Sequence, residues 1–277
     1  MQKRWPKDTV GSIRTGPLTT QKEARLIAQW LDSRFEHSIA ITAFLPQTQG
    51  IEAPWQLLRS YDSKQQDRLL EVAVVCAGGT CFWLPEQSDS ARLLGSEMFK
   101  LQPRRIVTTS FGGEILPSML TDQVNLLQGY EQSVMVREFH LPQAEGRMAT
   151  RSDIPRLIEY QHLYNQERSV AETPDWELLI QQAKVAVHEL EGQIVSIVRF
   201  GIETSRLVNL GGTYTFPGYR RQGYAARVLA FAVNQIIDRG RMAHLIVDRD
   251  NHSAVALYRQ IGFKSIGSSY VGYLAYS

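Results

Sequence analysis

The stretch from Leu210 to Gly240, LGGTYTFPGYRRQGYAARVLAFAVNQIIDRG, constrains the fold more than any other part of the chain. β-Branched and aromatic residues from Val208 to Phe216 predict a strand, and Pro217-Gly218 ends it. From Gln222 onward, apolar residues recur at intervals of three and four, and the glycine at the end of the stretch is typical of a helix stop. The sequence therefore predicts a strand, a turn and an amphipathic helix in direct succession.

The turn between this strand and this helix has the composition of an anion-binding site. Arg220 and Arg221 place two full charges beside a helix N-terminus, whose unpaired amides carry about half a positive charge. Gly223 removes the Cβ that would keep a ligand away from the backbone. These features suit a phosphate or pyrophosphate. The sequence contains neither the GxxxxGK[ST] pattern of Walker loops nor the GxGxxG pattern of dinucleotide-binding folds.

The turn resembles the acetyl-CoA-binding signature of the GNAT acyltransferases, Q/R-x-x-G-x-G/A, which falls here on residues 220–225. A second block, from Asn251 to Phe263, is similar to that family's N-x-x-A-x-x-x-Y-x-x-x-G-F pattern, with Ala254 and Tyr258 in register. The resemblance implies the GNAT acyl-CoA N-acyltransferase fold, a mixed α/β fold with a central, mixed, splayed sheet.

The resemblance also implies where acetyl-CoA, the expected co-substrate, would bind. Its pantetheine arm would pair with the strand edge Gly212–Phe216, in a slot between that edge and Leu245–Asp248. Gly211-Gly212 would fit a bulge near the splay, although a glycine pair also permits tight packing without any ligand. The implied cofactor-binding residues are Thr213, Tyr214, Thr215, Phe216, Arg220, Arg221, Gln222, Gly223, Tyr224, Ala225, Ala226, Asn251 and Ser253.

Tyr258 is the candidate catalytic residue implied by the second block. Its hydroxyl would lie near the thioester sulfur and donate a proton to the thiolate that leaves when the acyl group is transferred. The alternative is a packing role in an amphipathic helix, with the hydroxyl in water. Asn251, likewise, can cap its helix as well as reach a pantetheine amide.

A general base is also expected, because a lysine-like amine with a pKa near 10.4 must lose a proton before it attacks. Many GNAT proteins carry a glutamate on the signature strand, but Leu207–Tyr214 contains no carboxylate here. The base therefore stays unassigned. The candidates, each of which is equally a solvated surface group, are Glu159, Glu167, Glu172, Asp175 and His188.

The chain of 277 residues is long enough for two domains, which we place at residues 1–134 and 135–277, with a core at 146–277. The second follows the GNAT order of helices and strands. The first has a similar order, but residues 85–115 contain nothing like the phosphate-binding turn. Topology alone thus predicts a degenerate GNAT-like domain in the first half. The spans predicted along this part of the chain are 20–35 (helix), 69–84 (hairpin), 90–99 (helix), 105–109 (strand), 113–127 (helix) and 134–139 (strand).

Composition argues against several other classes of protein. The net charge of +2 is spread evenly over both halves, which disfavours a nucleic-acid partner. No apolar run approaches the roughly 20 residues of a membrane span, and the N-terminus lacks the apolar core of a secretory signal, so we expect a cytoplasmic protein. HExxH, CxxC and GxSxG motifs are absent, which disfavours a built-in metal site and a serine nucleophile. Cys76 and Cys81 are expected to be free, buried thiols.

The sequence therefore predicts an enzyme, an N-acetyltransferase that moves an acetyl group from acetyl-CoA directly to an amine acceptor. The acceptor, a small molecule or a peptide, cannot be identified from these motifs. The alternative is a non-catalytic module of the same fold that binds acyl-CoA as a sensor or serves protein contacts. The oligomeric state, a homodimer included, is left open by the sequence.

Overall fold

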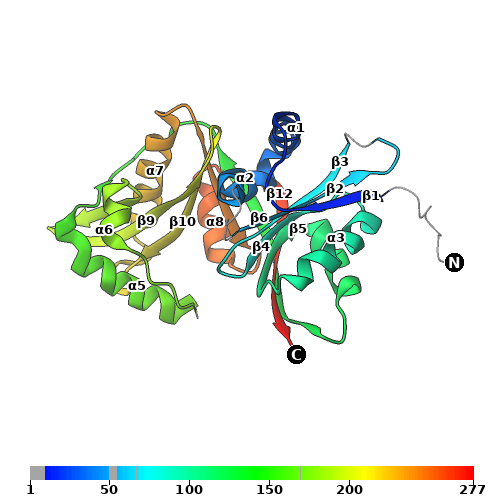
Figure 1. Cartoon of the computed structure of the whole chain (residues 1–277). Helices are drawn as coiled ribbons and strands as arrows, with labels where there is room; N and C mark the ends of the chain where they lie inside the picture. The colour runs from blue at the N-terminus through cyan, green and yellow to red at the C-terminus, as the bar shows by residue number, and fades with distance from the viewer. Residues whose placement is uncertain (1–9, 50–54, 66–67, 169) are drawn as a thin grey trace. The chain divides into compact units, whose positions relative to one another are not determined.

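The computed structural model describes residues 10–49, 55–65, 68–168 and 170–277. The chain divides into two units, labelled in Figure 1 by their helices and strands. The first unit comprises the chain up to Val134 together with Asp248–Asp250 and Ile266–Ser277. The second unit comprises Met135–Val247 and Asn251–Ser265. The C-terminal twelve residues therefore pack with the first unit, although the predicted second domain ran to residue 277.

The first unit is built on a sheet with strand order β1-β2-β3-β4-β5-β12-β6. Helices α1 and α2 pack on one face around Ile27 and Leu31, and α3 packs on the other around Leu94 and Met98. Its elements are β1 (Val10–Thr15), α1 (Gln21–Asp32), α2 (Phe35–Phe44), β2 (Gln56–Asp62), β3 (Leu69–Val75), β4 (Thr80–Leu84), α3 (Ser88–Lys100), β5 (Arg105–Thr109), α4 (Ser110–Ile115), most of β6 (Val124–Arg137) and most of β12 (Lys264–Tyr276).

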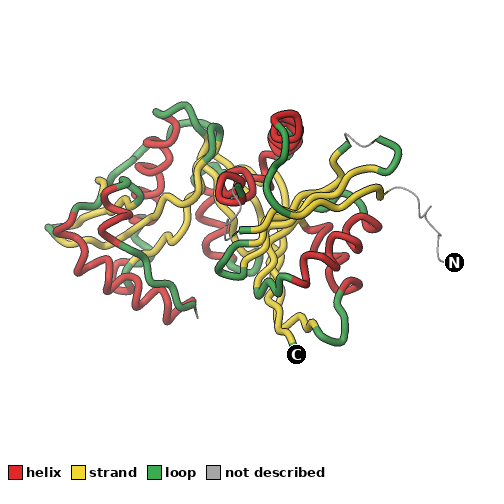
Figure 2. Tube along the Cα trace, in the orientation of Figure 1, coloured by secondary structure: helices red, strands yellow, loops and turns green. Residues whose placement is uncertain are grey.

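The second unit has its own strand order, β11-β10-β9-β8-β7, with β10 and β11 parallel and the other pairs antiparallel. Helices α7 and α8 pack on one face of these strands, and α5 and α6 pack on the other; Figure 2 shows the helices on both sides of the strands. Its elements are β7 (Arg147–Met148), α5 (Ile154–Arg168), α6 (Trp176–Gln181), β8 (Val185–Leu190), β9 (Gln193–Glu203), β10 (Leu207–Thr215), α7 (Tyr224–Ile237), β11 (Met242–Asp248) and α8 (His252–Gln260).

Local signals explain where several of these elements begin and turn. Thr20 caps α1 by accepting a hydrogen bond from the Glu23 amide, as its Thr-x-x-Glu pattern predicts. Before α5, Thr150 and Asp153 form a capping box. Gly192 has a φ of 80° in the hairpin turn between β8 and β9.

Several predicted elements of the first unit are confirmed, and some are wrong. The strand at 105–109, the hairpin at 69–84 and the helices near 20–35 and 90–99 are present. The predicted helix at 113–127 is wrong, because α4 ends at Ile115 and the chain returns as β6 from Val124. Residues 264–276, for which the sequence blocks imply no element, form one continuous strand, β12. Strand β1 was not predicted from the sequence.

Cys76 and Cys81 are free and buried, as predicted. Burial raises the pKa of the Cys76 thiol to about 12. Among the described residues, no helix is both long and apolar enough to cross a membrane.

Candidate functional site

Strands β10 and β11 part after a short stretch of pairing. Within the described residues they pair at Leu207–Met242, Val208–Ala243 and Asn209–His244, and pairing ends there although both strands continue. The edge of β10 from Leu210 onward is therefore not paired with β11. The backbone groups of such an edge can bond an extended ligand as they would bond another strand.

The first unit differs at the corresponding pair of strands. There, β4 pairs with β5 in parallel from Thr80 to Trp83, four of the five residues of β4. An edge of β4 comparable to that of β10 is therefore already occupied by β5. This geometry agrees with the missing phosphate-binding turn in the same half of the sequence.

The loop before α7 presents backbone rather than side chains. Gly223, the residue at the helix N-cap, has a φ of 84°, and a Cβ built on it meets nothing within 4 Å. Arg221 also has a positive φ, of 64°. The first helical bond runs from the Arg227 amide to the Gly223 carbonyl, so the amides of residues 224–226 precede it and lack helical acceptors. The loop and helix start together form a turn open to an anion.

The two arginines of the turn have different environments. Arg220 donates to both carboxylate oxygens of Glu167, at 2.7 and 2.8 Å, and to the Thr215 carbonyl at 2.9 Å. It also lies over the ring of Tyr214, whose hydroxyl donates to the same carboxylate. Arg221 and Gln222 are exposed. Of the two guanidinium groups, that of Arg221 is better placed to meet a pyrophosphate, because Arg220 is held by its ion pair.

Tyr258 of helix α8 packs against the core cluster that includes Leu210 of β10. Burial raises the pKa of Tyr258. At the start of the helix, the Asn251 side chain accepts a hydrogen bond from the Ala254 amide at 3.3 Å, and the Ser253 hydroxyl donates to Asn251. Asn251 is therefore a helix cap. The Tyr258 side chain is of intermediate exposure, and its ring packs against Phe263 with centroids 5.9 Å apart.

The residues of β10 and its end that were expected to bind the cofactor offer it mainly their backbone groups, because their side chains have partners inside the second unit. Tyr214 and Phe216 are buried in the core beneath α5 and α6, where Arg156 lies over the Phe216 ring. The Thr215 hydroxyl is within hydrogen-bonding distance of Ser196. Tyr224, at the start of α7, stacks on His188 with ring centroids 5.1 Å apart.

Each residue considered as a general base already has a structural partner. Glu159 pairs with Arg156, Glu167 with Arg220, and Glu172 with Arg199. Asp175 caps α6 by accepting from the Leu178 amide, and His188 is buried against Tyr224 and the Glu145 carbonyl. Glu159, Glu167 and Glu172 are thus neutralised by arginines.

Three residues near the reacting end were not found from the sequence. Tyr164 of α5 is close enough to Tyr258 to influence its pKa electrostatically. The hydroxyl of Tyr160 donates to the Gly212 carbonyl at 2.9 Å, and Arg199 of β9 lies at the same glycine. The spacing of the two tyrosines along α5 is that of an ordinary packing stripe, so no sequence signal distinguished them.

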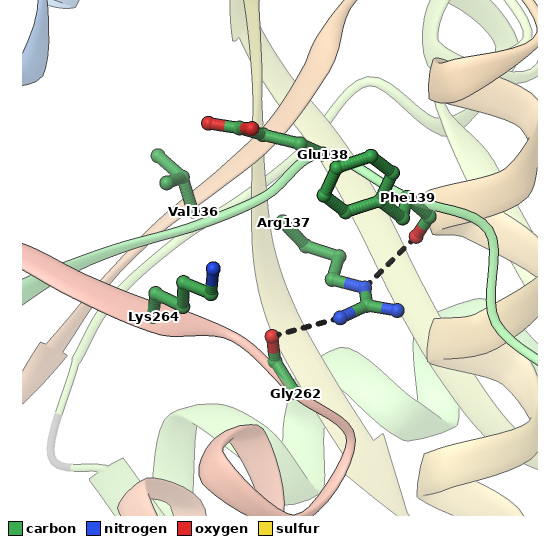
Figure 3. Close-up of a pocket in the computed structure, with 6 residues that line it drawn as sticks. All are labelled: Val136, Arg137, Glu138, Phe139, Gly262 and Lys264. Atoms are coloured by element: carbon green, nitrogen blue, oxygen red, sulfur yellow. Dashed lines mark hydrogen bonds between the residues drawn. The ribbon is translucent and has the colours of Figure 1, made fainter.

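Figure 3 shows a pocket elsewhere in the second unit, lined by Val136, Arg137, Glu138, Phe139, Gly262 and Lys264. The Arg137 guanidinium donates to the carbonyls of Phe139 and Gly262, and thereby ties the segment after β6 to the end of α8. None of the implied cofactor-binding residues lines this pocket. Among the described residues, no group of three or more His, Cys, Asp or Glu side chains could hold a metal ion.

Comparison with known protein families finds a match over part of the chain. Residues 154–263 match the model of the acetyltransferase (GNAT) family. This match confirms the family resemblance of the two sequence blocks for that segment. A comparison with curated proteins finds no match.

Solved structures are similar over nearly the whole chain. A GCN5-related N-acetyltransferase from Sphaerobacter thermophilus has a TM-score of 0.62 at 14% identity, with 95% of each chain covered. A GNAT-family acetyltransferase from Colwellia psychrerythraea has a TM-score of 0.56 at 12% identity, covering 96% of this chain and 100% of that one. A tandem GNAT protein from the clavulanic acid biosynthesis pathway has a TM-score of 0.54 at 11% identity, covering 96% and 98%. The chain therefore has the GNAT fold.

Proposed function

We propose that this protein, whose residues 154–263 match the GNAT family, transfers an acetyl group from acetyl-CoA to an amine acceptor. The observation that carries the proposal is the parting of β10 from β11 beside an open helix N-terminus. That combination offers one anion-binding turn and one free strand edge to a single long ligand. A pyrophosphate joined to an amide-containing arm matches both features.

The reaction would proceed by direct attack of the neutral amine on the thioester carbonyl. A carbon–nitrogen bond forms, and the carbon–sulfur bond then breaks with its electron pair leaving on sulfur. Tyr258 would donate its phenolic proton to that sulfur, while the amine nitrogen releases its own proton to solvent. Burial raises the pKa of Tyr258 above its ordinary value of 10.0, so the phenol carries a proton to donate at neutral pH but is a weaker acid than a phenol in water.

Calorimetric titration with acetyl-CoA tests the cofactor assignment. We expect saturable binding at micromolar concentrations, with the pyrophosphate at the turn around Gly223. A titration without detectable heat up to millimolar ligand would contradict the proposal. Because acetyl-CoA is one acyl-CoA among several, a propionyl-CoA titration in parallel shows whether the site selects the shorter acyl group.

Substituting Tyr258→Phe is expected to lower kcat by about 100-fold, because the leaving thiolate loses its proton donor. The KM for acetyl-CoA should stay close to the wild-type value, since the ring and its packing against Phe263 are kept. In the wild-type protein, kcat should fall at alkaline pH as the phenol ionises, above its ordinary pKa of 10.0. That limb should be missing in the variant. Thiol release with a panel of amines measures all three quantities, and undiminished turnover would rule out the acid role.

The second candidate is an acyl-CoA sensor that does not catalyse transfer. It is favoured by one observation, that every carboxylate considered as a base is held in an ion pair or a helix cap. Tight acetyl-CoA binding without thiol release over a broad amine panel would support it. The acceptor, a small-molecule or peptide amine, would be sought by the same panel. A cytoplasmic location belongs to either candidate and is likewise proposed.

A further inference from the structure

The link between β10 and α7 is held at its start by the side chain of one arginine. Strand β10 shifts its register against β9 at a bulge between Gly211 and Tyr214, and it ends at Thr215. Five residues later, the Arg220 Nε donates a hydrogen bond back to the Thr215 carbonyl at 2.9 Å. The chain between them contains one turn of 3-10 helix, Pro217–Tyr219. The Arg220 side chain therefore closes the loop that leads from the strand into the anion-binding turn.

Glu167, near the C-terminal end of α5, holds the guanidinium of this arginine. The Arg220 Nη2 donates to both carboxylate oxygens of Glu167, at 2.7 and 2.8 Å, and the guanidinium carbon lies 5.2 Å from the centre of the Tyr214 ring. The Tyr214 hydroxyl donates to the same carboxylate at 2.9 Å. Hydrogen bonds between charged groups are about twice as strong as those between neutral groups. Glu167 thus ties helix α5 both to the end of β10 and to the start of the turn.

The residue that follows Arg220 has a backbone conformation that needs support. Arg221 has a φ of 64°, in the left-handed region that residues with a Cβ rarely adopt. Such a conformation persists where the surrounding structure determines it. On one side of Arg221 the chain is fixed by the contacts of Arg220, and on the other side α7 begins at Tyr224. Without the Glu167 carboxylate, two hydrogen bonds of the Arg220 guanidinium are lost, and the first of these fixed points weakens.

We propose that Glu167 is a positioning residue for acetyl-CoA, which holds Arg220 so that the turn after it keeps the conformation that receives the pyrophosphate. This inference rests on the proposed function for its ligand, but its geometric part is testable without any ligand. Glu167 itself contacts neither the pyrophosphate nor the reacting atoms. In this assignment, the carboxylate that the sequence offered as a general base serves cofactor binding instead.

Glu167→Gln tests this role, because the amide keeps the size of the side chain and removes its charge. We expect the Kd and the KM for acetyl-CoA to rise about five- to tenfold, the effect of losing charge-assisted hydrogen bonds that hold the turn. The kcat at saturating acetyl-CoA should stay within about twofold of the wild-type value, because no group at the thioester is changed. Calorimetric titration measures the Kd, and thiol release measures the KM and kcat.

Glu203→Gln is the matched control for the loss of charge. Glu203 pairs with Arg241 at 2.9 Å, and its side chain is 42% exposed, against 41% for that of Glu167. It lies at the end of β9 opposite Val208, near the start of β10, whereas the turn follows the end of β10. This variant removes the same charge from the second unit and should leave the Kd, KM and kcat at their wild-type values.

Amide hydrogen exchange of the ligand-free protein tests the geometric part. The Tyr219 amide donates to the Phe216 carbonyl at 2.9 Å, inside the loop that Arg220 closes. It should exchange faster in Glu167→Gln than in the wild type, and at the wild-type rate in Glu203→Gln. Arg220→Lys keeps the charge and loses the guanidinium, so it should reproduce both the faster exchange and the higher Kd. Combining it with Glu167→Gln should add little, because both act on one contact.

Three results would overturn the inference. A lower Kd in Glu167→Gln would show that Glu167 withholds Arg220 from the pyrophosphate. A large fall of kcat with an unchanged Kd would return Glu167 to the role of general base. An unchanged Kd together with unchanged exchange of the Tyr219 amide would show that the ion pair positions nothing. If the wild type binds no acetyl-CoA, the proposed function fails instead, and the exchange of the Tyr219 amide alone decides whether Glu167 holds the turn.

Discussion

Gly223→Glu is expected to weaken acetyl-CoA binding by at least about 100-fold, which corresponds to about 2.7 kcal/mol. The new carboxylate would stand at the N-cap of α7, where the amides of residues 224–226 are proposed to meet the pyrophosphate. Two like charges about 4 Å apart repel by about 4 kcal/mol near a protein surface. The fold should persist, because a Cβ at Gly223 meets nothing within 4 Å. Calorimetric titration measures the loss.

Gly223→Gln separates charge from backbone strain in this experiment. Both substitutions place a side chain of similar size at a φ of 84°, which costs about 1 to 2 kcal/mol for any residue with a Cβ. The difference between them therefore measures the charge. It should shrink as salt is raised, since exposed charges are screened. Equal affinities for the two variants would show that no anion of the ligand lies at this turn.

The sequence predicted the region around this turn well because its signals are local. Proline and glycine end the strand, the helical period starts within two residues, and Gly211-Gly212 marks the bulge. Each of these features acts on the backbone where it occurs. The family resemblance also implied that β10 parts from β11, and these two strands are separated in the chain only by one turn and helix α7.

The sequence failed where distant segments decide the structure. Residues 116–127 carry apolar side chains at spacings that fit a helix, but Pro117 begins a short 3-10 turn and the chain then pairs as β6. Strand pairing across the sheet, which periodicity does not report, decides the outcome. The bond from Tyr160 to Gly212 joins residues 52 positions apart, and no motif links them. Residues 266–277 pack with the first unit for the same kind of reason.

Two buried carboxylates in the first unit show that the pKa of a buried carboxyl depends on whether a guanidinium lies on the same face of the sheet. Burial alone would raise the pKa of Glu23, but hydrogen bonds with Arg59, Tyr61 and Thr19 hold it at about 2. Arg59 and Ser60 are neighbours on β2, so their side chains leave opposite faces of the sheet. Glu71, across from Ser60 on β3, is consequently on the face without that guanidinium. Both carboxylate oxygens of Glu71 are buried without a hydrogen-bond partner, and burial raises the pKa of Glu71 to about 8.

Glu71→Gln is therefore expected to stabilise the first unit at high pH. A carboxyl whose pKa is about 8 when folded and about 4.5 when unfolded favours the folded state fully below pH 4.5. That contribution is lost as pH rises through 8, with a ceiling of about 5 kcal/mol for a shift of this size. The glutamine keeps the shape and has no charge to bury. We expect the variant to gain about 2 to 4 kcal/mol over the wild type at pH 9 and little at pH 5.

Urea unfolding of both proteins at pH 5, 7 and 9 measures this difference. Glu97→Gln is the matched control, because Glu97 lies on α3 in an exposed pair with Lys100. Its removal should change the free energy of unfolding by less than about 1 kcal/mol at each pH. A Glu71→Gln effect that is the same at pH 5 and pH 9 would show that Glu71 does not bury a titrating charge. A gain that grows with pH would show that ionisation of Glu71, buried without a hydrogen-bond partner, destabilises the first unit.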